Sequence, residues 1–283
     1  MKNIAIITDT DCSLPIDLVV KFGIQQVPIN LIIDGATYET GVDIDDHLLF
    51  EKIDQFKEYP TTSAPSPLAF EKAYKTAILK GYKTIICICV SSKVSGTYDS
   101  AVLASRLFQH DITVIDSQNL SMGQGFMVLA AAECVSTGGS KENVLEKITS
   151  VKSRIHTFAI LPCLKYIALS GRLKKYSAGI ADLLDIKPIL TVQDGKLEVV
   201  SKQRATNKAI AKTIELVNNI CEGKSIEQVA IIHSNNLEKA QFLFEKASSL
   251  TLPKEPYVLS EFTPGLSVHT GPGAIGITVL TNE

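Results

Sequence analysis

Two clusters of hydroxyl side chains are the feature of this sequence with the clearest potential for chemistry. "CVSSKVSGTYDSA" (89–101) places serines and threonine around one glycine, between an apolar run and a helical pattern. "YPTTSAPSP" (59–67) places Thr62 and Ser63 before a helix start that is marked by proline. Hydroxyls and free N–H groups at a helix start can bind an anion, although plain capping of the helix is the alternative. Because two such clusters occur, we expect both to donate hydrogen bonds to one ligand.

Three further candidates lie in the second half of the chain. Arg172 lies in the glycine-bearing segment "LSGRLKK" (169–175), and Arg204 lies beside another polar loop. A guanidinium offers a planar fork to carboxylates and phosphates, although a surface ion pair is the alternative for either arginine. His269 lies in "SVHTGPGAIG" (267–276), which we interpret as a loop whose glycines allow close approach of backbone to a ligand or another segment. We expect His269 to donate to an anion or to carry a proton, and a structural role is the alternative.

A pair of aspartates in "TDTDCS" (8–13) suggests different chemistry. Asp9 and Asp11 follow an apolar strand pattern, as in phosphatases that form an aspartyl phosphate. Such an enzyme also needs Mg²⁺, a later lysine and a further acidic pair after a strand, and we find no such later pair. Capping of a helix over 13–23 by Asp11 and Ser13 therefore explains the segment better. The sequence also lacks the Gly-x-x-x-x-Gly-Lys-Ser/Thr loop for ATP and the Gly-x-Ser-x-Gly motif of hydrolases.

The composition limits the classes of partner. The chain has 283 residues, 45% hydrophobic and 20% charged, which suffices for two domains with large cores. A formal net charge of −2 gives no electrostatic reason to expect nucleic acid as a partner. No apolar run approaches the ~20 residues of a membrane span, and acidic residues follow the start too soon for a signal peptide. The six scattered cysteines predict reduced thiols in a cytoplasmic protein, without a structural metal site.

The first half alternates strand and helix patterns. Short apolar runs predict strands at 3–9, 24–34, 83–90 and 111–117. Helical patterns occur at 13–23, 67–82, 96–108 and 123–139. This alternation predicts a parallel sheet with helices on both faces. Since such sheets bind ligands at the carboxyl ends of their strands, both the hydroxyl loop after 83–90 and the aspartate loop are expected at one edge.

The second half is less regular. A connecting helix is expected at 141–155, and strands are expected at 156–163, 229–235 and 273–280. The segment 190–204 predicts a hairpin with Asp194 and Gly195 at its turn. The fold class is therefore α/β with two domains. We place an N-terminal parallel sheet flanked by helices in residues 1–155, and a smaller mixed α/β domain in residues 156–283.

Four segments together resemble the DegV family of bacterial fatty-acid-binding proteins. They are "TDTDCSL", "TTSAPSP", "SSKVSGTYDSA" and "HTGPGAIG", and "SGRL" adds support. The match follows the order of the family across essentially the whole chain. The sequence departs from the usual pattern in the Asp-Cys of "TDTDCSL", where small residues are common, and at Ala64, where glutamine is common. Neither change removes a hydroxyl, so the ligand class implied by the resemblance stands.

The resemblance implies two α/β domains that bind one long-chain fatty acid through hydroxyl donors to its carboxylate. It further implies the acyl-carrying subunit of a fatty acid kinase, whose ATP-binding partner subunit phosphorylates the presented carboxylate. Carried onto this sequence, Thr62 and Ser95 hold the carboxylate and His269 lies close to it. The resemblance places Ser63, Ser92 and Gly96 as neighbours, and Arg172 and Arg204 near the head group or at the partner surface. No catalytic residue, ATP site, cofactor or metal is expected.

Physical chemistry is consistent with such a carrier. Burial of twelve methylenes supplies roughly 10 kcal/mol before the cost of association. A buried carboxylate must be hydrogen-bonded, and hydroxyl donors leave it more nucleophilic than a tight arginine pair would. Aliphatic residues of the helices after Gly23, Gly96 and Gly125 are candidates for the lining. Two rival interpretations remain open: a small-molecule phosphatase or phosphotransferase that uses Asp9 and Asp11, and an interaction protein that needs no lipid.

Overall fold

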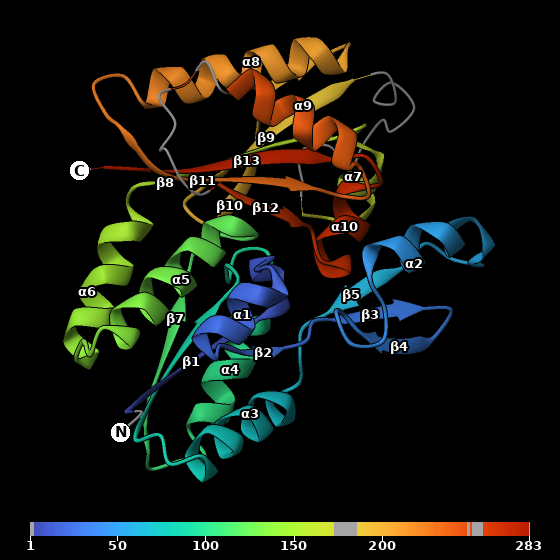
Figure 1. The fold of residues 1–283 in the computed structure, drawn as a ribbon. Coiled ribbons are helices and arrows are strands. Elements are labelled where there is room, and N and C mark those ends of the chain that lie inside the picture. The colour runs from blue at the N-terminus through green and yellow to red at the C-terminus, as the bar shows by residue number, and fades with distance from the viewer. Residues whose placement is uncertain (1–2, 173–185, 248–249, 251–256, 283) are drawn as a thin grey trace.

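The computed structural model describes residues 3–172, 186–247, 250 and 257–282. The described residues form three β-sheets, with four, six and three strands. Figure 1 shows the six-stranded sheet above the four-stranded one, with the three-stranded sheet to one side. Of the segment "LSGRLKK", the residues after Arg172 lie outside the described ranges.

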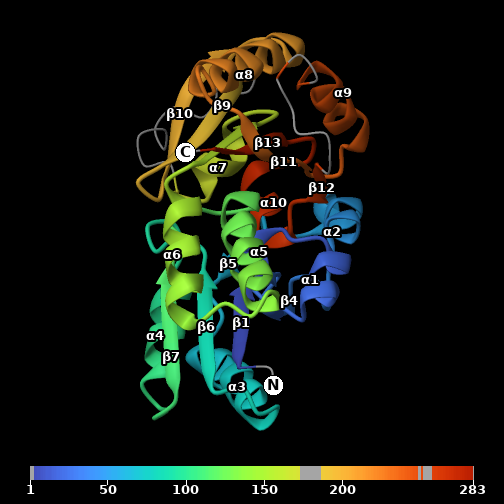
Figure 2. The same ribbon diagram turned by 60° about the vertical axis from the view of Figure 1, so that its left-hand side comes forward.

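The four-stranded sheet is parallel, as predicted, with the strand order β2-β1-β6-β7. Its strands are β1 (Ile4–Asp9), β2 (Gln25–Val27), β6 (Thr84–Cys89) and β7 (Asp111–Asp116). Its helices are α1 (Ile16–Phe22), α3 (Pro67–Leu79), α4 (Thr97–Ser105), α5 (Met122–Ser136) and α6 (Lys141–Lys152). Ile6 packs with the core under α5, while its neighbour Ile7 packs with α3 and α4, so alternate residues of the strand serve opposite faces. Figure 2 shows α5 and α6 side by side along one face of this sheet.

Two local predictions in this half are wrong. Ser13 does not cap α1, because it has φ 51° and ends the short helix η1 (Thr10–Cys12), while Pro15 stands at the N-cap of α1. The predicted strand 24–34 is two strands, β2 and β3 (Asn30–Ile33), which belong to different sheets. Pro28 lies between them, and proline has no N–H to donate to a sheet ladder.

The three-stranded sheet was not expected. It has the order β4-β3-β5 and consists of β3, β4 (Ala36–Glu39) and β5 (Thr61–Ser63). Two short helices, α2 (Asp46–Lys52) and η2 (Ile53–Gln55), lie between β4 and β5 in the chain. Thr62 therefore lies on a strand and not at a helix start, since Ser66 is the residue that caps α3. Thr62 pairs with Leu31 of β3, which is fully buried, so the fold fixes the face on which Thr62 stands.

The six-stranded sheet is mixed, as predicted for the second half, with the order β10-β9-β8-β13-β11-β12. Its strands are β8 (Ile155–Ile160), β9 (Lys187–Gln193), β10 (Lys196–Gln203), β11 (Ile226–His233), β12 (Val258–Glu261) and β13 (Ile275–Thr281). Its helices are α7 (Lys165–Leu169), α8 (Thr206–Ile220), α9 (Leu237–Ala247) and α10 (Pro264–Thr270). The predicted hairpin turn is confirmed, because Asp194 and Gly195 both have positive φ, at 49° and 78°.

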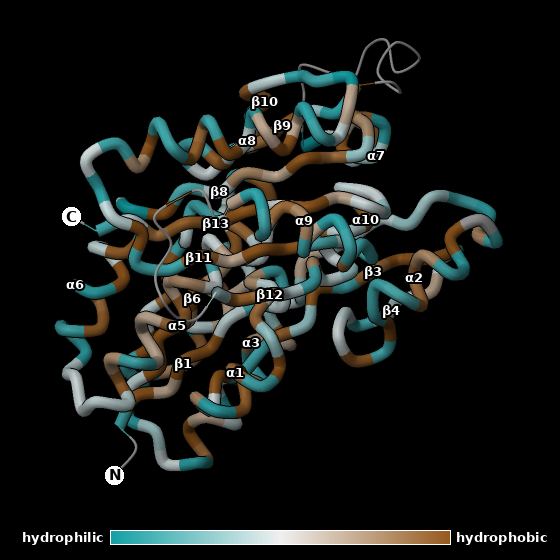
Figure 3. The backbone as a smooth tube through the Cα atoms, turned by 45° about the horizontal axis from the view of Figure 1, so that its top comes forward, coloured by the Kyte–Doolittle hydropathy of each residue, from teal (hydrophilic) through white to brown (hydrophobic). Residues whose placement is uncertain are grey.

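The two large sheets share one hydrophobic core. Ile88 of β6 and Met127 of α5 belong to the same buried cluster as Leu190 of β9 and Ile232 of β11. Figure 1 shows α8 and α9 on the face of the six-stranded sheet that is turned away from the four-stranded sheet. Figure 3 shows brown, hydrophobic segments along central strands such as β11 and β13. The six-stranded sheet begins at Ile155, while the division into domains 1–155 and 156–283 stays a prediction.

Two further findings concern the cysteines and whether any helix could span a membrane. All six cysteines are free. None of the helices within the described ranges has the length and apolar character needed to cross a membrane.

Candidate functional site

A cavity of about 270 Å³ lies between the six-stranded sheet and the carboxyl ends of β1 and β6. This volume is just below the range of small-molecule sites, about 300–1,000 Å³. Its wall has a polar part, at the strand ends and α10, and an apolar part that is shared between the six-stranded sheet and nearby segments. The polar part consists of Asp11, Thr62, Ser63, Ser95, Gly96, Ser121, Arg172, His269 and Thr270.

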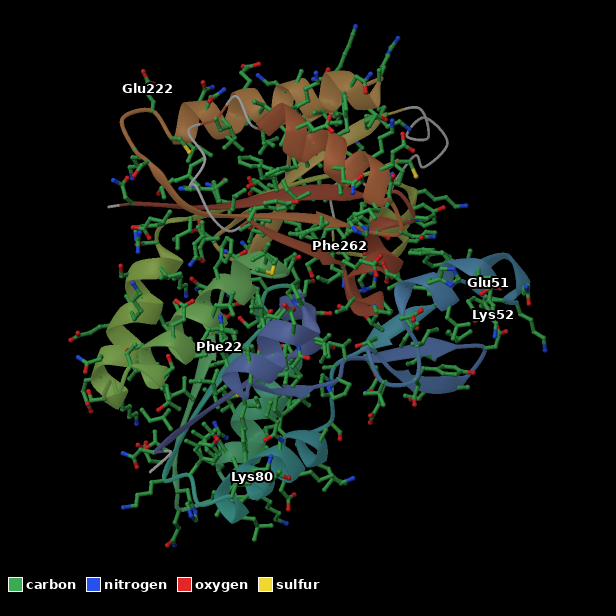
Figure 4. The ribbon with its side chains drawn as sticks, viewed as in Figure 1. Phe22, Glu51, Lys52, Lys80, Glu222 and Phe262 are labelled. Carbon is green, nitrogen blue, oxygen red and sulfur yellow. The ribbon has the colours of Figure 1, made fainter. Side chains whose placement is uncertain are left out.

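The apolar part comes from the inner face of the six-stranded sheet and from nearby loops. Leu190 and Ile232 belong to the wall, whereas their neighbours Ile189 and Ile231 pack on the other face under α8 and α9. The other apolar residues of the wall include Ile29, Val90, Val94, Leu120, Ala159, Ile167, Val192, Leu197, Phe262 and Leu266. Figure 4 places Phe262 on the side of the sheet that faces the rest of the molecule. A wall of aliphatic side chains suits a hydrocarbon chain.

Thr62, His269 and Arg172 form the centre of the polar part. The Oγ1 atom of Thr62 lies 2.9 Å from Nε2 of His269. Arg172 donates from Nη2 to the same Oγ1 at 3.1 Å, and from Nη1 to the backbone carbonyl of Ser170 at 3.0 Å. A guanidinium only donates, so Thr62 must accept from Arg172 and keeps its own hydroxyl hydrogen for an acceptor. The three residues come from β5, α10 and the turn after α7, and only the folded chain brings them together.

Ser95 has the same type of arrangement. Its Oγ accepts from the backbone N–H of Thr97 at 3.3 Å and lies 2.8 Å from Oγ1 of Thr97. A Cβ built on Gly96 would lie 3.7 Å from Cβ of Ala64, so this loop packs directly against the segment that follows Thr62. The two predicted hydroxyl clusters therefore meet at one end of the cavity, although Thr62 arrives there on a strand.

Among the described residues of the polar part, Arg172 carries the one permanent positive charge. Burial and the charge of Arg172 lower the pKa of His269 to about 3, so the imidazole is neutral at physiological pH. Burial lowers the pKa of Arg172 from its usual range while nearby Asp11 opposes that change, and a guanidinium remains protonated under either influence. The site thus offers neutral hydroxyl donors backed by one cation, a combination that favours a singly charged anion.

Asp9 and Asp11 differ in their relation to this cavity. Asp9 is fully buried and accepts hydrogen bonds from the protein itself, whereas Asp11 belongs to the cavity wall. Within the described ranges, no group of three or more His, Cys, Asp or Glu side chains is placed to hold a metal ion.

Two of the predicted site residues lie elsewhere. Ser92 donates from its Oγ to Oδ2 of Asp116 at 2.5 Å and is not among the described residues of the cavity wall. Arg204 is exposed between β10 and α8, away from that wall, so its alternative place at a partner surface stays a prediction. The six others do line the cavity: Thr62, Ser63, Ser95, Gly96, Arg172 and His269.

Some features of the site were missed or misplaced. His269 stands in the last turn of helix α10, not in a loop. Gly271 follows with φ 82°, and a Cβ there would come within 2.1 Å of the ring of Tyr166, so glycine is needed for the close approach of α7 to α10. The expectation that helices α4 and α5 supply the lining is wrong, because the described aliphatic residues of the wall lie on strands, on loops and on helices α7 and α10. In β9 and β11, successive apolar side chains point to opposite faces, and this alternation indicates which residues share a face. It does not tell whether that face meets a cavity or the hydrophobic core.

Comparison with known proteins identifies the class to which this fold and site belong. The family model described as "Uncharacterised protein, DegV family" matches residues 3–282, and the chain belongs to the DegV family. A DegV domain-containing protein of Caldanaerobacter subterraneus is 35% identical over 280 residues, which cover 98% of each chain.

Solved structures agree with the fold. A DegV family protein from Thermus thermophilus, reported with fatty acid binding, has a TM-score of 0.92 and 30% identity, with 99% of this chain and 100% of that chain covered. DegV of Bacillus subtilis, described as a fatty acid binding protein, has a TM-score of 0.87 and 29% identity, with 98% and 99% covered.

Proposed function

We propose that this protein binds one long-chain fatty acid, with the carboxylate at Thr62 and Ser95 and the acyl chain along the six-stranded sheet. The observation that carries this proposal is the hydrogen bonding of the Thr62 and Ser95 hydroxyls. Each accepts a hydrogen bond from an N–H group, Arg172 Nη2 for Thr62 and the backbone of Thr97 for Ser95. Neither hydroxyl hydrogen is used in these bonds. A carboxylate in the cavity offers two acceptor oxygens for them, in competition with His269 Nε2 at Thr62 and with Thr97 Oγ1 at Ser95.

His269 adapts to the presence of that ligand. As the neutral tautomer with hydrogen on Nε2, it donates to Thr62 and leaves the hydroxyl hydrogen to the carboxylate. As the other tautomer, it accepts that hydrogen when the ligand is absent. His269 thus completes the hydrogen bonding of Thr62 in both states without adding a charge.

The apolar wall accounts for the affinity. Transfer of each methylene from water contributes about 0.8 kcal/mol, so a chain of some twelve buried methylenes offsets the cost of association. Fatty acid binding described for the relatives from Thermus thermophilus and Bacillus subtilis supports the same ligand class.

We further propose that the protein presents this carboxylate to an ATP-binding fatty acid kinase subunit, and that the γ-phosphoryl group passes from ATP to a carboxylate oxygen. Neutral hydroxyl donors support this role, because they hold the carboxylate and leave electron density on its oxygens. The rival role of Asp9 as a phosphatase nucleophile finds no support in the geometry. Its carboxylate is fully buried and accepts from Asp11 N, Val90 N and Gln124 Nε2.

The test is gentle extraction of protein purified without delipidation, followed by mass spectrometry. We expect one C14–C18 fatty acid per chain, and delipidated protein should recover it on incubation with the acid. Protein that is consistently empty and does not take up the acid contradicts the proposal. Metal-dependent phosphatase activity that is lost in Asp9→Asn would support the rival interpretation instead. Conversion of the bound acid to acyl phosphate with ATP and the kinase subunit tests the second step.

A further inference from the structure

Asp9 and Asp11 form a pair of buried carboxyls with unequal hydrogen bonding. They are 0% and 6% exposed. Asp9 accepts three hydrogen bonds, from Val90 N at 2.8 Å, Asp11 N at 3.0 Å and Gln124 Nε2 at 3.2 Å. The one hydrogen bond that the described residues give to the carboxyl of Asp11 is a long one, 3.3 Å from Thr263 Oγ1 to Oδ1.

This inequality decides which carboxyl keeps a proton. Two adjacent buried carboxyls do not both ionise readily, because each charge disfavours the other. Donors stabilise the charged form, so the better-supplied Asp9 is the one to ionise. Burial, together with the charge of Asp9, raises the pKa of Asp11 well above its usual range, against smaller opposing effects of Thr263 and Arg172. Asp11 is thus a neutral carboxylic acid in the wall of the cavity.

The groups around Asp11 make its charge important for the ligand. Arg172 is the cation that acts on Asp11, and His269 is neutral for the reasons given above. The Cys12 thiol also remains neutral, because burial and Asp9 raise its pKa to about 12. With Asp9 charged, ionisation of Asp11 would place a second negative charge beside a single arginine. A third one, on a ligand carboxylate, would then face two negative charges, with Arg172 as the one cation among the described residues of the cavity wall.

We propose that Asp11 is a positioning residue that holds the proton needed for anion binding, so that a fatty acid carboxylate enters only while Asp11 is uncharged. This inference rests on the proposed function and adds a proton to it. When Asp11 is ionised in the empty protein, binding of the anion takes up one proton from solvent onto an oxygen of Asp11. The affinity is then expected to fall as pH rises through the pKa of Asp11, by up to about tenfold per pH unit.

The test separates protein titration from ligand titration. Binding of hexadecanesulfonate, which stays ionised, is measured between pH 6 and 9 beside binding of palmitate. Calorimetry in two buffers of different ionisation enthalpy gives the number of protons taken up at the alkaline end. We expect wild type to lose affinity for both ligands toward pH 9 and to take up protons. Asp11→Asn keeps a neutral acceptor for Thr263, so its binding should show neither the pH dependence nor the proton uptake of wild type.

Asp46→Asn is the matched control. Asp46 is another buried acid, whose pKa burial raises to about 8; it accepts from Ser267 of α10 and lies outside the described cavity wall. The Asp46→Asn variant should show the same pH dependence of ligand affinity as wild type. Loss of the pH dependence of affinity in Asp46→Asn but not in Asp11→Asn overturns the inference. The inference is also overturned if wild type binds each of the two ligands with the same affinity at pH 6 as at pH 9. Should the sulfonate not enter the cavity, proton uptake with palmitate decides the question. Failure of palmitate to bind at any pH contradicts the proposed function itself.

Discussion

Replacement of Thr62 by valine is the most direct test of the head-group site. Valine has nearly the shape of threonine, so the substitution removes the hydroxyl with little change in volume. The hydroxyl is the common partner of His269 Nε2 at 2.9 Å and Arg172 Nη2 at 3.1 Å. The substitution therefore removes one donor from the ligand and one partner from each of these two side chains.

The expected loss follows from the charge of the ligand. A hydrogen bond to a charged group contributes about 1.5–3 kcal/mol. This corresponds to about a 10- to 150-fold weaker fatty acid affinity, since 1.4 kcal/mol is a factor of ten. Stability of the empty protein should change less, because Arg172 also donates to the carbonyl of Ser170 and the cavity admits water.

Thr61→Val provides the control, because it is the same substitution one residue earlier on β5. Thr61 is exposed and pairs with Ile32, whereas Thr62 pairs with the buried Leu31. Displacement of a fluorescent fatty acid measures the affinity, and thermal unfolding without ligand measures the stability. We expect a loss of affinity in Thr62→Val alone. Equal affinities of Thr62→Val and wild type, or an equal loss in both variants, would refute the placement of the carboxylate at Thr62.

Further predictions concern the rest of the site and one turn. Ser95→Ala should weaken fatty acid binding by about 1–3 kcal/mol. Ser92→Ala should leave it unchanged, because the Ser92 hydroxyl is bonded to Asp116 outside the cavity. A titration in which Ser92→Ala weakens binding more than Ser95→Ala contradicts the placement of the carboxylate at Ser95. Gly195→Ala should lower the unfolding temperature, since Gly195 has φ 78° and a Cβ there would lie 2.5 Å from Oγ of Ser91. A variant as stable as wild type would exclude this tight contact. Because the pKa of His269 is lowered to about 3, its protonation is confined to acid, and the pH dependence of affinity between pH 5 and 7 should be the same in wild type and His269→Gln. A step near pH 6.5 that His269→Gln removes would show an ionisable His269.

The sequence predicted the regular parts of the fold and missed the short ones. Strands of six residues such as β1 and β6 have enough apolar positions to be recognised, and Asp194-Gly195 marks its hairpin by residue type alone. The strands of the three-stranded sheet have only three or four residues, too few for a period to emerge. This is why Thr62 was assigned to the start of a helix.

The residues of the site divide in the same way. Six of the eight predicted site residues line the cavity, since hydroxyls, arginine and histidine are conspicuous in polar segments, and their role in ligand binding stays a prediction. The apolar wall could not be predicted, because Leu190 and Ile232 differ from their neighbours Ile189 and Ile231 only in the face on which they stand. One face meets a cavity and the other meets helices, and a strand pattern records alternation without recording what lies opposite.

Helix α10 connects this site to the core of the three-stranded sheet. Val268 is fully buried in the cluster of Leu31 and Leu49, and its carbonyl accepts from the hydroxyl of Tyr59 at 2.6 Å. The next residue, His269, meets Thr62 from 207 positions away in the chain. Successive residues of one helix thus secure the small sheet and complete the head-group site. A ligand that binds only the assembled site stabilises the docking of α10 by mass action, so occupation of the cavity and attachment of the small sheet are thermodynamically linked.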